Sequence, residues 1–239
     1  MEIDRGLLLI LGQVPSEFEG RFNEWYDEDH APARLAVPGI LTARRYKEAS
    51  VEVMSDSQVH SSQVPAYIHS APSDTVTYLT FYGLANLEVL DSAEYGALSI
   101  GESSALESEV KQVAKFDRRV YDAIPSQDAA EADQVNICGR YLLCVWQSNE
   151  GNHREIPVPS QPSGLLRTRR YRLNSGRGAE QLTLFDIESR DAVVEIFEKG
   201  SFHAVRNSGD SKDSGREIRL FQLHRRFDHA NPPTTAVDG

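Results

Sequence analysis

Short segments in which apolar and polar residues alternate run through the chain, and this alternation predicts half-buried β-strands. Four such segments have a second, similar copy later in the chain, and the copies keep the same order. The pairs, which begin 134, 125, 103 and 107 residues apart, are LLLILGQ (7–13) with YLLCVWQ (141–147), PGILTARRY (38–46) with SGLLRTRRY (163–171), YLTFYGL (78–84) with QLTLFDI (181–187), and DRRVYD (117–122) with HRRFDH (224–229). An ordered recurrence of strand patterns predicts a duplicated structural unit.

The segment between the first two strands has the periodicity of a helix. From Phe18, apolar residues recur at the i, i+4, i+7 and i+8 positions, which places one apolar face against a sheet. Ser16 and Glu19 have the spacing of a capping box, which satisfies free backbone N–H groups at a helix start. A helix is therefore predicted over 16–30, and Pro32 is expected to end it because proline interrupts the helical hydrogen bonds.

Further helices are predicted within 87–98 and within 102–114, so that each unit has the order β-α-β-β-α-β of a ferredoxin-like fold. The predicted fold class is α+β, with two such repeats in one chain. The expected boundaries are a first repeat over 1–124, a polar linker over 125–134, a second repeat over 135–229 and a disordered tail over 230–239.

The two predicted repeats differ in length at two places. The fall in offset from 134 to 125 leaves the second copy nine residues shorter where the first has its helix, in the Pro- and Gly-rich segment SNEGNHREIPVPSQPSG (148–164). The fall from 125 to 103 gives the first copy 22 extra residues, in a loop over 49–74. Long loops inside compact domains are commonly lids or binding loops. Because both the full helix and the long loop belong to the first repeat, a single asymmetric site is expected there.

Composition and charge narrow the class of partner. The chain has 239 residues and 40% hydrophobic content, which is enough for a sizeable core. A formal net charge of −11 disfavours nucleic acid and anionic membrane surfaces as partners, and a small molecule is the expected one. The opening segment has the pattern of a strand and not of a signal peptide, and no apolar run approaches the length of a membrane span, so a cytoplasmic location is expected.

Cysteine usage and the common catalytic motifs suggest neither a metal nor a cofactor. Cys138 and Cys144 are too few for a disulfide framework or a structural zinc site, and two small buried apolar side chains are expected. The sequence has no G-x-G-x-x-G after a strand, no P-loop, no G-x-S-x-G and no H-E-x-x-H. Its seven histidines show no tight ligand spacing. No metal site and no nucleotide cofactor are therefore expected.

The segment FNEWYDEDHAPARLAVPGILTARRY (22–46) resembles the signature of the dimeric α/β-barrel superfamily, in particular its EthD-like branch. In that branch, a helix ending in W-Y-x-x-x-H-x-P is followed by a Val-Pro-Gly turn and an Arg-Arg-Tyr strand. The resemblance implies that two ferredoxin-like sheets combine into one barrel. Most relatives reach this arrangement by dimerising, whereas the duplicated pattern implies that both halves lie in this one chain.

Members of this superfamily include cofactor-free decarboxylases, cyclases and oxygenases of polyketide and aromatic metabolism, as well as haem-using branches. The resemblance therefore leaves the reaction open. The second half has no equivalent of Trp25, Tyr26 or His30 at its shortened helix, which favours one site over two.

His30 is the candidate catalytic residue. It lies four residues after Tyr26, and a helix places both side chains on the face turned toward the sheet. The helix dipole and the neighbouring acids favour the imidazolium form while desolvation opposes it, so proton transfer near neutral pH is expected. Asp29 and Asp27 are the candidates for orienting the ring. The alternative is a histidine that only complements the helix dipole, next to acids on a solvated face.

The candidate substrate-binding residues are aromatic or cationic, and they are Trp25, Tyr26, Arg45, Tyr46, His69, Tyr78 and Tyr82. Strand alternation sends one of Arg44 and Arg45 into the barrel and the other toward the helices, and one of them is expected to hold an anionic group of the substrate. The three tyrosines on strands are expected to line a flat-walled cavity, which His69 would close from the long loop. Ordinary packing of the barrel is the alternative for these tyrosines.

Together these features lead to the hypothesis of a cofactor-independent enzyme of specialised metabolism. It would hold an aromatic, polyketide-type or polycyclic substrate in a cavity of the barrel and decarboxylate, dehydrate or cyclise it, with His30 as acid or base. A haem-binding barrel oxidoreductase and a non-catalytic ligand-binding protein are the alternatives. Whether the single-chain barrel pairs further into a homodimer is left open.

Overall fold

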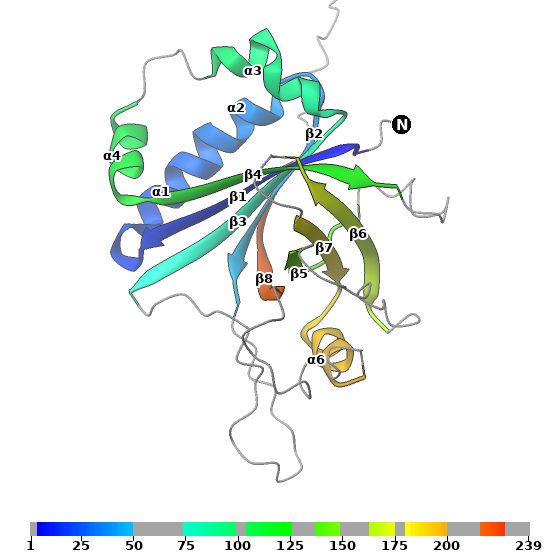
Figure 1. The fold of residues 1–239 in the computed structure, drawn as a ribbon. Helices are drawn as coiled ribbons and strands as arrows, with labels where there is room; N and C mark the ends of the chain where they lie inside the picture. The colour runs from blue at the N-terminus through cyan, green and yellow to red at the C-terminus, as the bar shows by residue number, and fades with distance from the viewer. Residues whose placement is uncertain are drawn as a thin grey trace, which may run out of the picture.

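The computed structural model describes residues 4–49, 74–98, 104–125, 137–148, 163–174, 180–199 and 216–227. Its strands are β1 (Gly6–Pro15), β2 (Ile40–Glu48), β3 (Thr75–Leu84), β4 (Lys115–Ile124), β5 (Tyr141–Ser148), β6 (Leu165–Leu173), β7 (Glu180–Ile187) and β8 (Arg216–Phe227). All neighbouring strands are antiparallel, and they form one closed barrel in the order β1-β3-β2-β8-β5-β7-β6-β4 (Figure 1). The predicted α+β class and the barrel are therefore confirmed.

The first four strands and the last four have the same order within the barrel. This order is β4-β1-β3-β2 in the first half and β8-β5-β7-β6 in the second. Two seams, the strand pairs β2–β8 and β4–β6, join the halves and close the barrel. A glycine with positive φ precedes the second strand of each half, Gly39 at 87° and Gly164 at 79°, and a β-bulge follows each glycine. The predicted offset of 125 residues matches the backbone at this turn.

The predicted correspondence of the first strands is wrong by one residue. Leu7 pairs with Gly83 on β3, and Leu142 pairs with Asp186 on β7. Gly83 and Asp186 are 103 residues apart, as predicted for the third strands, so Leu7 corresponds to Leu142 at an offset of 135 and not 134. A shift of one residue exchanges the two faces of a strand, and the run LLLIL has no polar residue to mark the inner face.

The predicted correspondence of the last strands is also wrong. Leu7 pairs with Tyr121 on β4, and Leu142 pairs with Phe221 on β8, so the last strands correspond at an offset of 100 and not 107. Similar basic segments occur on both strands, but the backbone places them seven residues out of register. Local similarity between short basic segments does not determine which backbone groups pair.

The helices of the first half lie together outside the barrel, and the described helix of the second half lies apart from them (Figure 1). The helical segments are η1 (Ser16–Phe18), α1 (Glu19–Trp25), η2 (Tyr26–His30), α2 (Ala31–Leu35), η3 (Leu87–Asp91), α3 (Ala93–Ala97), α4 (Ala105–Val113) and α6 (Arg190–Lys199). The helices predicted within 87–98 and 102–114 are present. In the first half, α1 packs on β1 and α4, and α2 packs on β2 and β8.

Pro32 does not end the first helix, contrary to the prediction. The segment η2 is a widened π turn, in which the N–H of Ala31 donates to the carbonyl of Tyr26, five residues earlier. After this turn the helix continues as α2, and Pro32 lies in its first turn. Proline is tolerated in a first turn, where its missing N–H is not needed. The helical path therefore extends to Leu35.

The predicted capping box is absent as well. Pro15 precedes the 3-10 turn η1, and no side chain caps it. The carboxylate of Glu19, which would have capped the helix, instead accepts hydrogen bonds from Lys47 on β2 and Tyr78 on β3. Glu19 therefore forms hydrogen bonds with side chains of the sheet and does not cap the start of the helix.

Side chains alternate between the barrel interior and its outer wall. An apolar cluster to which all eight strands contribute fills the interior, and its buried members are Leu7, Leu9, Leu11, Tyr46, Leu79, Phe81, Tyr121, Leu142, Cys144, Trp146, Tyr171, Leu182, Leu184 and Phe221. Three further clusters lie on the outer wall, where the helices pack. Cys138 lies before β5 and packs half-buried against the interior cluster, and both cysteines are free.

Several predictions fall on residues that the structure does not describe. These are nearly all of the linker at 125–134, nearly all of the loop at 49–74 with His69, most of the shortened first-helix segment of the second half at 148–164, and the tail at 230–239. Among the residues that are described, no helix is long and apolar enough to cross a membrane.

Two glycines make a matched pair for testing the packing of the barrel. A Cβ at Gly139 would lie within 3 Å of backbone atoms of Asp186 and Ile187 on β7, which cannot move aside cheaply. We expect Gly139→Ala to lower the free energy of unfolding by about 1–3 kcal/mol. Gly96 in α3 has no atom near that position, and Gly96→Ala is expected to raise stability by about 0.5 kcal/mol. Urea denaturation measures the stability of both variants, and equal denaturation midpoints for Gly139→Ala and Gly96→Ala would contradict this packing.

Candidate functional site

Most of the predicted site residues do not line the barrel interior, contrary to the prediction, and instead meet in one place between the first helix and the outer wall of β2 and β3. We call this place the helix–sheet site, and the predicted residues in it are Trp25, Tyr26, His30, Arg45, Tyr78 and Tyr82. The helix contributes its aromatic face, and the strands contribute the side chains beneath it. Phe22 links the two layers, with ring centroids 5.5 Å from both Tyr26 and Tyr78.

Tyr46 does not belong to this site, contrary to the prediction. On β2 it pairs with Leu79 of β3, and both side chains are in the interior cluster of the barrel. Tyr78 precedes Leu79 and so lies on the opposite face, under the helix. The predicted split of the two arginines is confirmed: Arg44 points into the barrel near Phe81, and Arg45 points toward the helix.

Arg45 is the centre of the helix–sheet site. Its side chain is fully buried, and its guanidinium carbon lies 5.2 Å from the ring centroid of Phe22, 4.3 Å from that of Tyr26 and 4.5 Å from that of Tyr78. These three rings form an aromatic cage around the cation. Inside the cage, Nη1 donates to the carboxylate of Asp27, and Nη2 donates to Asn23 Oδ1 at 2.9 Å.

Asp27 is the acid that balances this buried cation. It lies in the η2 turn, and its side chain is buried beneath the helix. Burial raises the pKa of Asp27, but the hydrogen bond from His224 and the charge of Arg45 outweigh burial and hold the pKa below its usual value. The carboxylate is therefore ionised at neutral pH.

Tyr78 belongs to a polar chain at the edge of the cage. Its hydroxyl donates to Glu19 at 2.6 Å and accepts from Asn23 Nδ2 at 2.9 Å. Lys47 Nζ approaches Glu19 at 2.7 Å from the solvent side. Burial, reinforced by the hydrogen bond to Glu19, raises the pKa of Tyr78, so this phenol stays neutral and donates.

His30 packs between two aromatic rings of its own helix. Its ring centroid lies 4.2 Å from that of Trp25 and 4.6 Å from that of Tyr26. Arg34, one turn later, places Nη1 3.0 Å from Nδ1 of His30. A guanidinium group only donates, so Nδ1 accepts this bond and the proton of the neutral ring is on Nε2.

The expected titration of His30 near neutral pH is wrong. Burial, followed by the charge of Arg34, lowers the pKa of His30 to about 2, so the imidazole is neutral at physiological pH. Asp29 is exposed, and the ring nitrogen that it was expected to orient is held by Arg34 instead. The acids that precede the histidine in sequence do not determine its charge, because the residue one helical turn later shares its face.

Two buried N–H donors of the site have no acceptor among the described residues. They are Nε of Arg45 and Nε of Arg34. Both guanidinium groups lie near the fully buried Tyr82, whose pKa is held well above its usual value by burial and by the adjacent Tyr26 hydroxyl. A buried donor without an acceptor is costly, and an anionic oxygen of a ligand would satisfy it.

Sequence reasoning missed two members of the site. Asn23 lies four residues before Asp27, and this helical spacing is the signal that would have found it. His224 reaches Asp27 from β8, 197 residues away in the chain, and no local pattern points to it. The contact exists because β2 pairs with β8 at a seam of the barrel.

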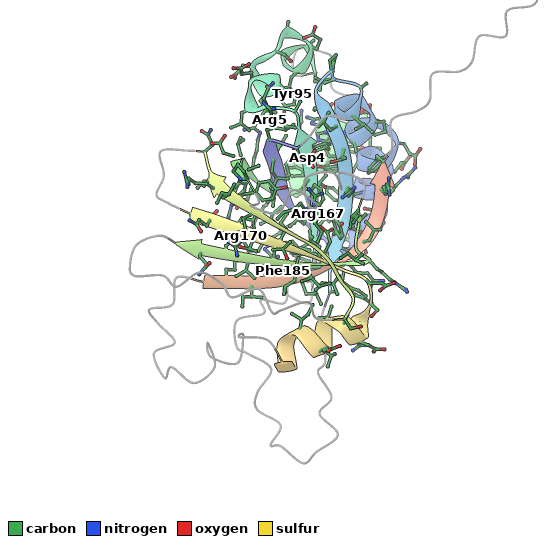
Figure 2. All side chains as sticks on the ribbon, turned by 90° about the vertical axis from the view of Figure 1, so that its right-hand side faces the viewer. Asp4, Arg5, Tyr95, Arg167, Arg170 and Phe185 are labelled. Atoms are coloured by element: carbon green, nitrogen blue, oxygen red, sulfur yellow. The ribbon has the colours of Figure 1, made fainter. Side chains whose placement is uncertain are left out.

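Charged side chains inside the barrel form a separate cluster. Arg169 is held by Asp186 through Nε at 3.1 Å and Nη2 at 2.8 Å. Asp4 lies near Arg167 between the two halves (Figure 2), and its pKa is raised because burial outweighs the nearby arginines. Arg44 donates to the carbonyl of Ile137 at 2.8 Å. These bonds tie the strands together from within, which indicates a structural role.

No family model and no curated protein matches the sequence. Solved structures match its fold. A candidate monooxygenase of Fusobacterium nucleatum subsp. nucleatum is 11% identical, over 93% of this chain and 94% of its own, with a TM-score of 0.52. An anthrone oxidase-like protein (9% identity, 94% and 93% covered, TM-score 0.49) and a candidate monooxygenase of Lactobacillus acidophilus (9%, 94% and 96%, TM-score 0.46) are also similar. The first likeness shows a shared fold, which in this chain is a closed eight-stranded α+β barrel.

Proposed function

We propose that the chain is a cofactor-independent enzyme of specialised metabolism that processes an aromatic or polyketide-type small molecule at the helix–sheet site. One observation carries this proposal: two buried guanidinium N–H donors have no acceptor among the described residues, and they lie beside a neutral histidine and a layer of aromatic rings. Flat rings suit an aromatic ligand, and N–H donors suit a phenolate, enolate or carboxylate oxygen on it.

His30 acts in this proposal as a hydrogen-bond donor. In decarboxylation, the electrons of the broken C–C bond move into a neighbouring carbonyl and make an enolate oxygen. Dehydration and aldol-type cyclisation pass through the same kind of oxyanion. The Nε2–H of neutral His30, together with the Nε–H groups of Arg45 and Arg34, stabilises that oxygen as charge develops. A histidine with a pKa of about 2 is poorly suited to accept a proton itself.

We also propose that the two halves are ferredoxin-like units that arose by tandem duplication, in an arrangement related to the EthD-like branch. The identical strand order, the matching bulges and the matching positive-φ glycines support this origin. The site uses the helix of the first half, so one site per chain is the expectation.

Replacement of His30 tests the proposal. The substrate is to be found by comparing the metabolites of strains with and without the gene. We expect His30→Ala to lower kcat by about 100-fold or more while KM changes less, because the lost hydrogen bond is made mainly in the transition state. Asp29→Asn, one residue away on the exposed side, is the matched control and should stay within about twofold. Unchanged turnover in a folded His30→Ala protein would remove His30 from the mechanism.

Two measurements on the purified protein separate this reaction class from its alternatives. Oxygen uptake coupled to turnover would assign an oxygenase reaction, which the name of the Fusobacterium protein suggests. A Soret band would assign the haem alternative. His30 fits poorly as an axial haem ligand, because aromatic rings pack against it and Arg34 holds Nδ1. Tight binding of the substrate without turnover would leave the ligand-binding alternative.

A further inference from the structure

We propose that His224, from the second half of the chain, is the proton-transfer residue of the helix–sheet site and that Asp27 is its positioning residue. This inference rests on the proposed function. His224 Nε2 lies 3.2 Å from Asp27 Oδ2, so a histidine of β8 and an acid of η2 form a dyad across the β2–β8 seam. His30 cannot fill this role, since its Nδ1 is held by Arg34.

The dyad is built like an oriented general base. Asp27 is buried and ionised, and its other oxygen accepts from Arg45, so the carboxylate cannot turn away from His224. An ionised carboxylate only accepts, which places the proton of the neutral imidazole on Nε2. The rings of Tyr78 and His224 pack edge to face, with 5.2 Å between their centroids. Two contacts therefore fix both the tautomer and the orientation of the imidazole.

The other ring nitrogen, Nδ1, is available for a substrate. No described residue forms a hydrogen bond with it, and 28% of the His224 side chain is exposed, against 8% for Asp27. Glu19 is the other candidate base beneath the helix, but Lys47 and Tyr78 both donate to its Oε1 and its pKa is lowered, so its carboxylate is a weaker base than an imidazole. His224 thus combines a free lone pair, access from solvent and a fixed orientation.

His224 Nδ1 takes a proton from an acidic O–H or C–H of the substrate, and the electron pair of that bond stays on the substrate as a phenolate or enolate. The resulting imidazolium is stabilised by Asp27 through Nε2–H. When the reaction is complete, the same proton returns to the substrate carbon or to the leaving group, and His224 is neutral again.

Other charged or titratable groups surround the dyad and set its electrostatic environment. They come from every element that packs on it, and they are Glu19 of α1, Glu28 of η2, Arg45 and Lys47 of β2, Tyr78 of β3, and Arg225 of β8 itself. Arg225 is the natural control, because it neighbours His224 on β8 and also approaches Asp27, at 3.5 Å, but cannot accept a proton.

One experiment tests the dyad without any substrate. Nitrogen-15 chemical shifts of the His224 ring at pH 8 report which nitrogen carries the proton. We expect an Nε2–H tautomer with unprotonated Nδ1 in the natural protein, and a mixture of tautomers in Asp27→Asn. An Nδ1–H tautomer in the natural protein would overturn the proposal even if the enzyme is active. The result does not depend on whether the proposed function is correct.

The second experiment uses the substrate and chemical rescue. We expect His224→Ala to lower kcat/KM by about 100-fold or more. Added imidazole should then raise the kcat/KM of this variant by about tenfold or more. Imidazole should not rescue His30→Ala, and Arg225→Gln should remain within about threefold of the natural protein. His224→Gln should also lose the acid limb of the pH profile of kcat/KM.

Each outcome decides between a catalytic and a structural role. Loss of activity in His224→Ala without rescue, and with an unchanged pH profile in His224→Gln, would make His224 a structural link between the halves. Full activity in His224→Gln would overturn the proposal directly. Inactivity of the natural protein toward every candidate substrate would count against the proposed function, whereas the tautomer measurement would still decide on the dyad.

Discussion

Replacing Arg45 by methionine should lower the free energy of unfolding by about 3–5 kcal/mol, the largest effect that we expect from a single substitution. Methionine fills much of the space inside the aromatic cage of Phe22, Tyr26 and Tyr78, so loss of volume is a minor part of the effect. The main cause is Asp27, a buried carboxylate that loses its fully buried cation. Urea denaturation at pH 7 measures the change.

Two further variants separate the charge from the packing. Arg45→Met combined with Asp27→Leu removes both charges, and most of the lost stability should return, because an apolar pair can replace a buried ion pair at little cost. Arg21→Met is the exposed control. Its salt bridge with Glu109 is 2.6 Å long but half-exposed, so less than about 1 kcal/mol should be lost. If Arg45→Met lowers the free energy of unfolding by less than about 1 kcal/mol, this explanation is wrong, because the buried carboxylate of Asp27 would then not depend on the charge of Arg45.

Acid should destabilise the protein through His30, and this is the second large effect. The pKa of His30 is about 2 in the folded chain, against about 6.5 in an unfolded one, so below pH 6.5 the unfolded state binds a proton that the folded state excludes. The stability is fully present above pH 6.5 and is lost as the pH falls toward 2. The slope is about 1.4 kcal/mol per pH unit, which amounts to about 3 kcal/mol at pH 4.

His30→Gln isolates this contribution, since glutamine can accept the hydrogen bond from Arg34 but does not titrate. Asp27 and Glu19 also have lowered pKa values in the folded chain, so they add to acid sensitivity in both proteins and cancel in the difference. Urea denaturation of the natural protein and of His30→Gln, each at pH 7 and at pH 4, gives the free energy of unfolding that each protein loses in acid. Equal losses in the natural protein and in His30→Gln would contradict a buried, neutral His30.

The helix–sheet site contains two histidines in different environments. One histidine is neutral, packed against aromatic rings and held by Arg34, which suits it to donate to an oxyanion. The other, His224, is half-exposed and paired with an ionised acid, which suits it to move a proton. Arg45 connects the two environments, because its guanidinium touches Tyr26 on the His30 side and Tyr78 on the His224 side.

Much of the scaffold could be predicted from the sequence, because period-2 alternation and glycine turns are local properties. The alternation separated Arg44 from Arg45, and the helical spacing put Trp25, Tyr26 and His30 beside each other. The local rules for where a helix begins and ends gave wrong predictions where tertiary contacts or a widened turn changed the first helix. Glu19 was assigned to a capping box but binds Tyr78, and the path continues through Pro32 because a widened turn precedes it.

The sequence by itself determined the strand-forming segments, the α+β class and the aromatic face of the first helix, all of which follow from side-chain spacing along a few turns of chain. Only the tertiary structure decided the register of the first and last strands, the face on which Tyr46 lies, the charge of His30 and the meeting of His224 with Asp27. The physical reason is that burial and electrostatic interactions depend on distances in space. Barrel closure brings together groups 197 residues apart, and no local pattern records that distance.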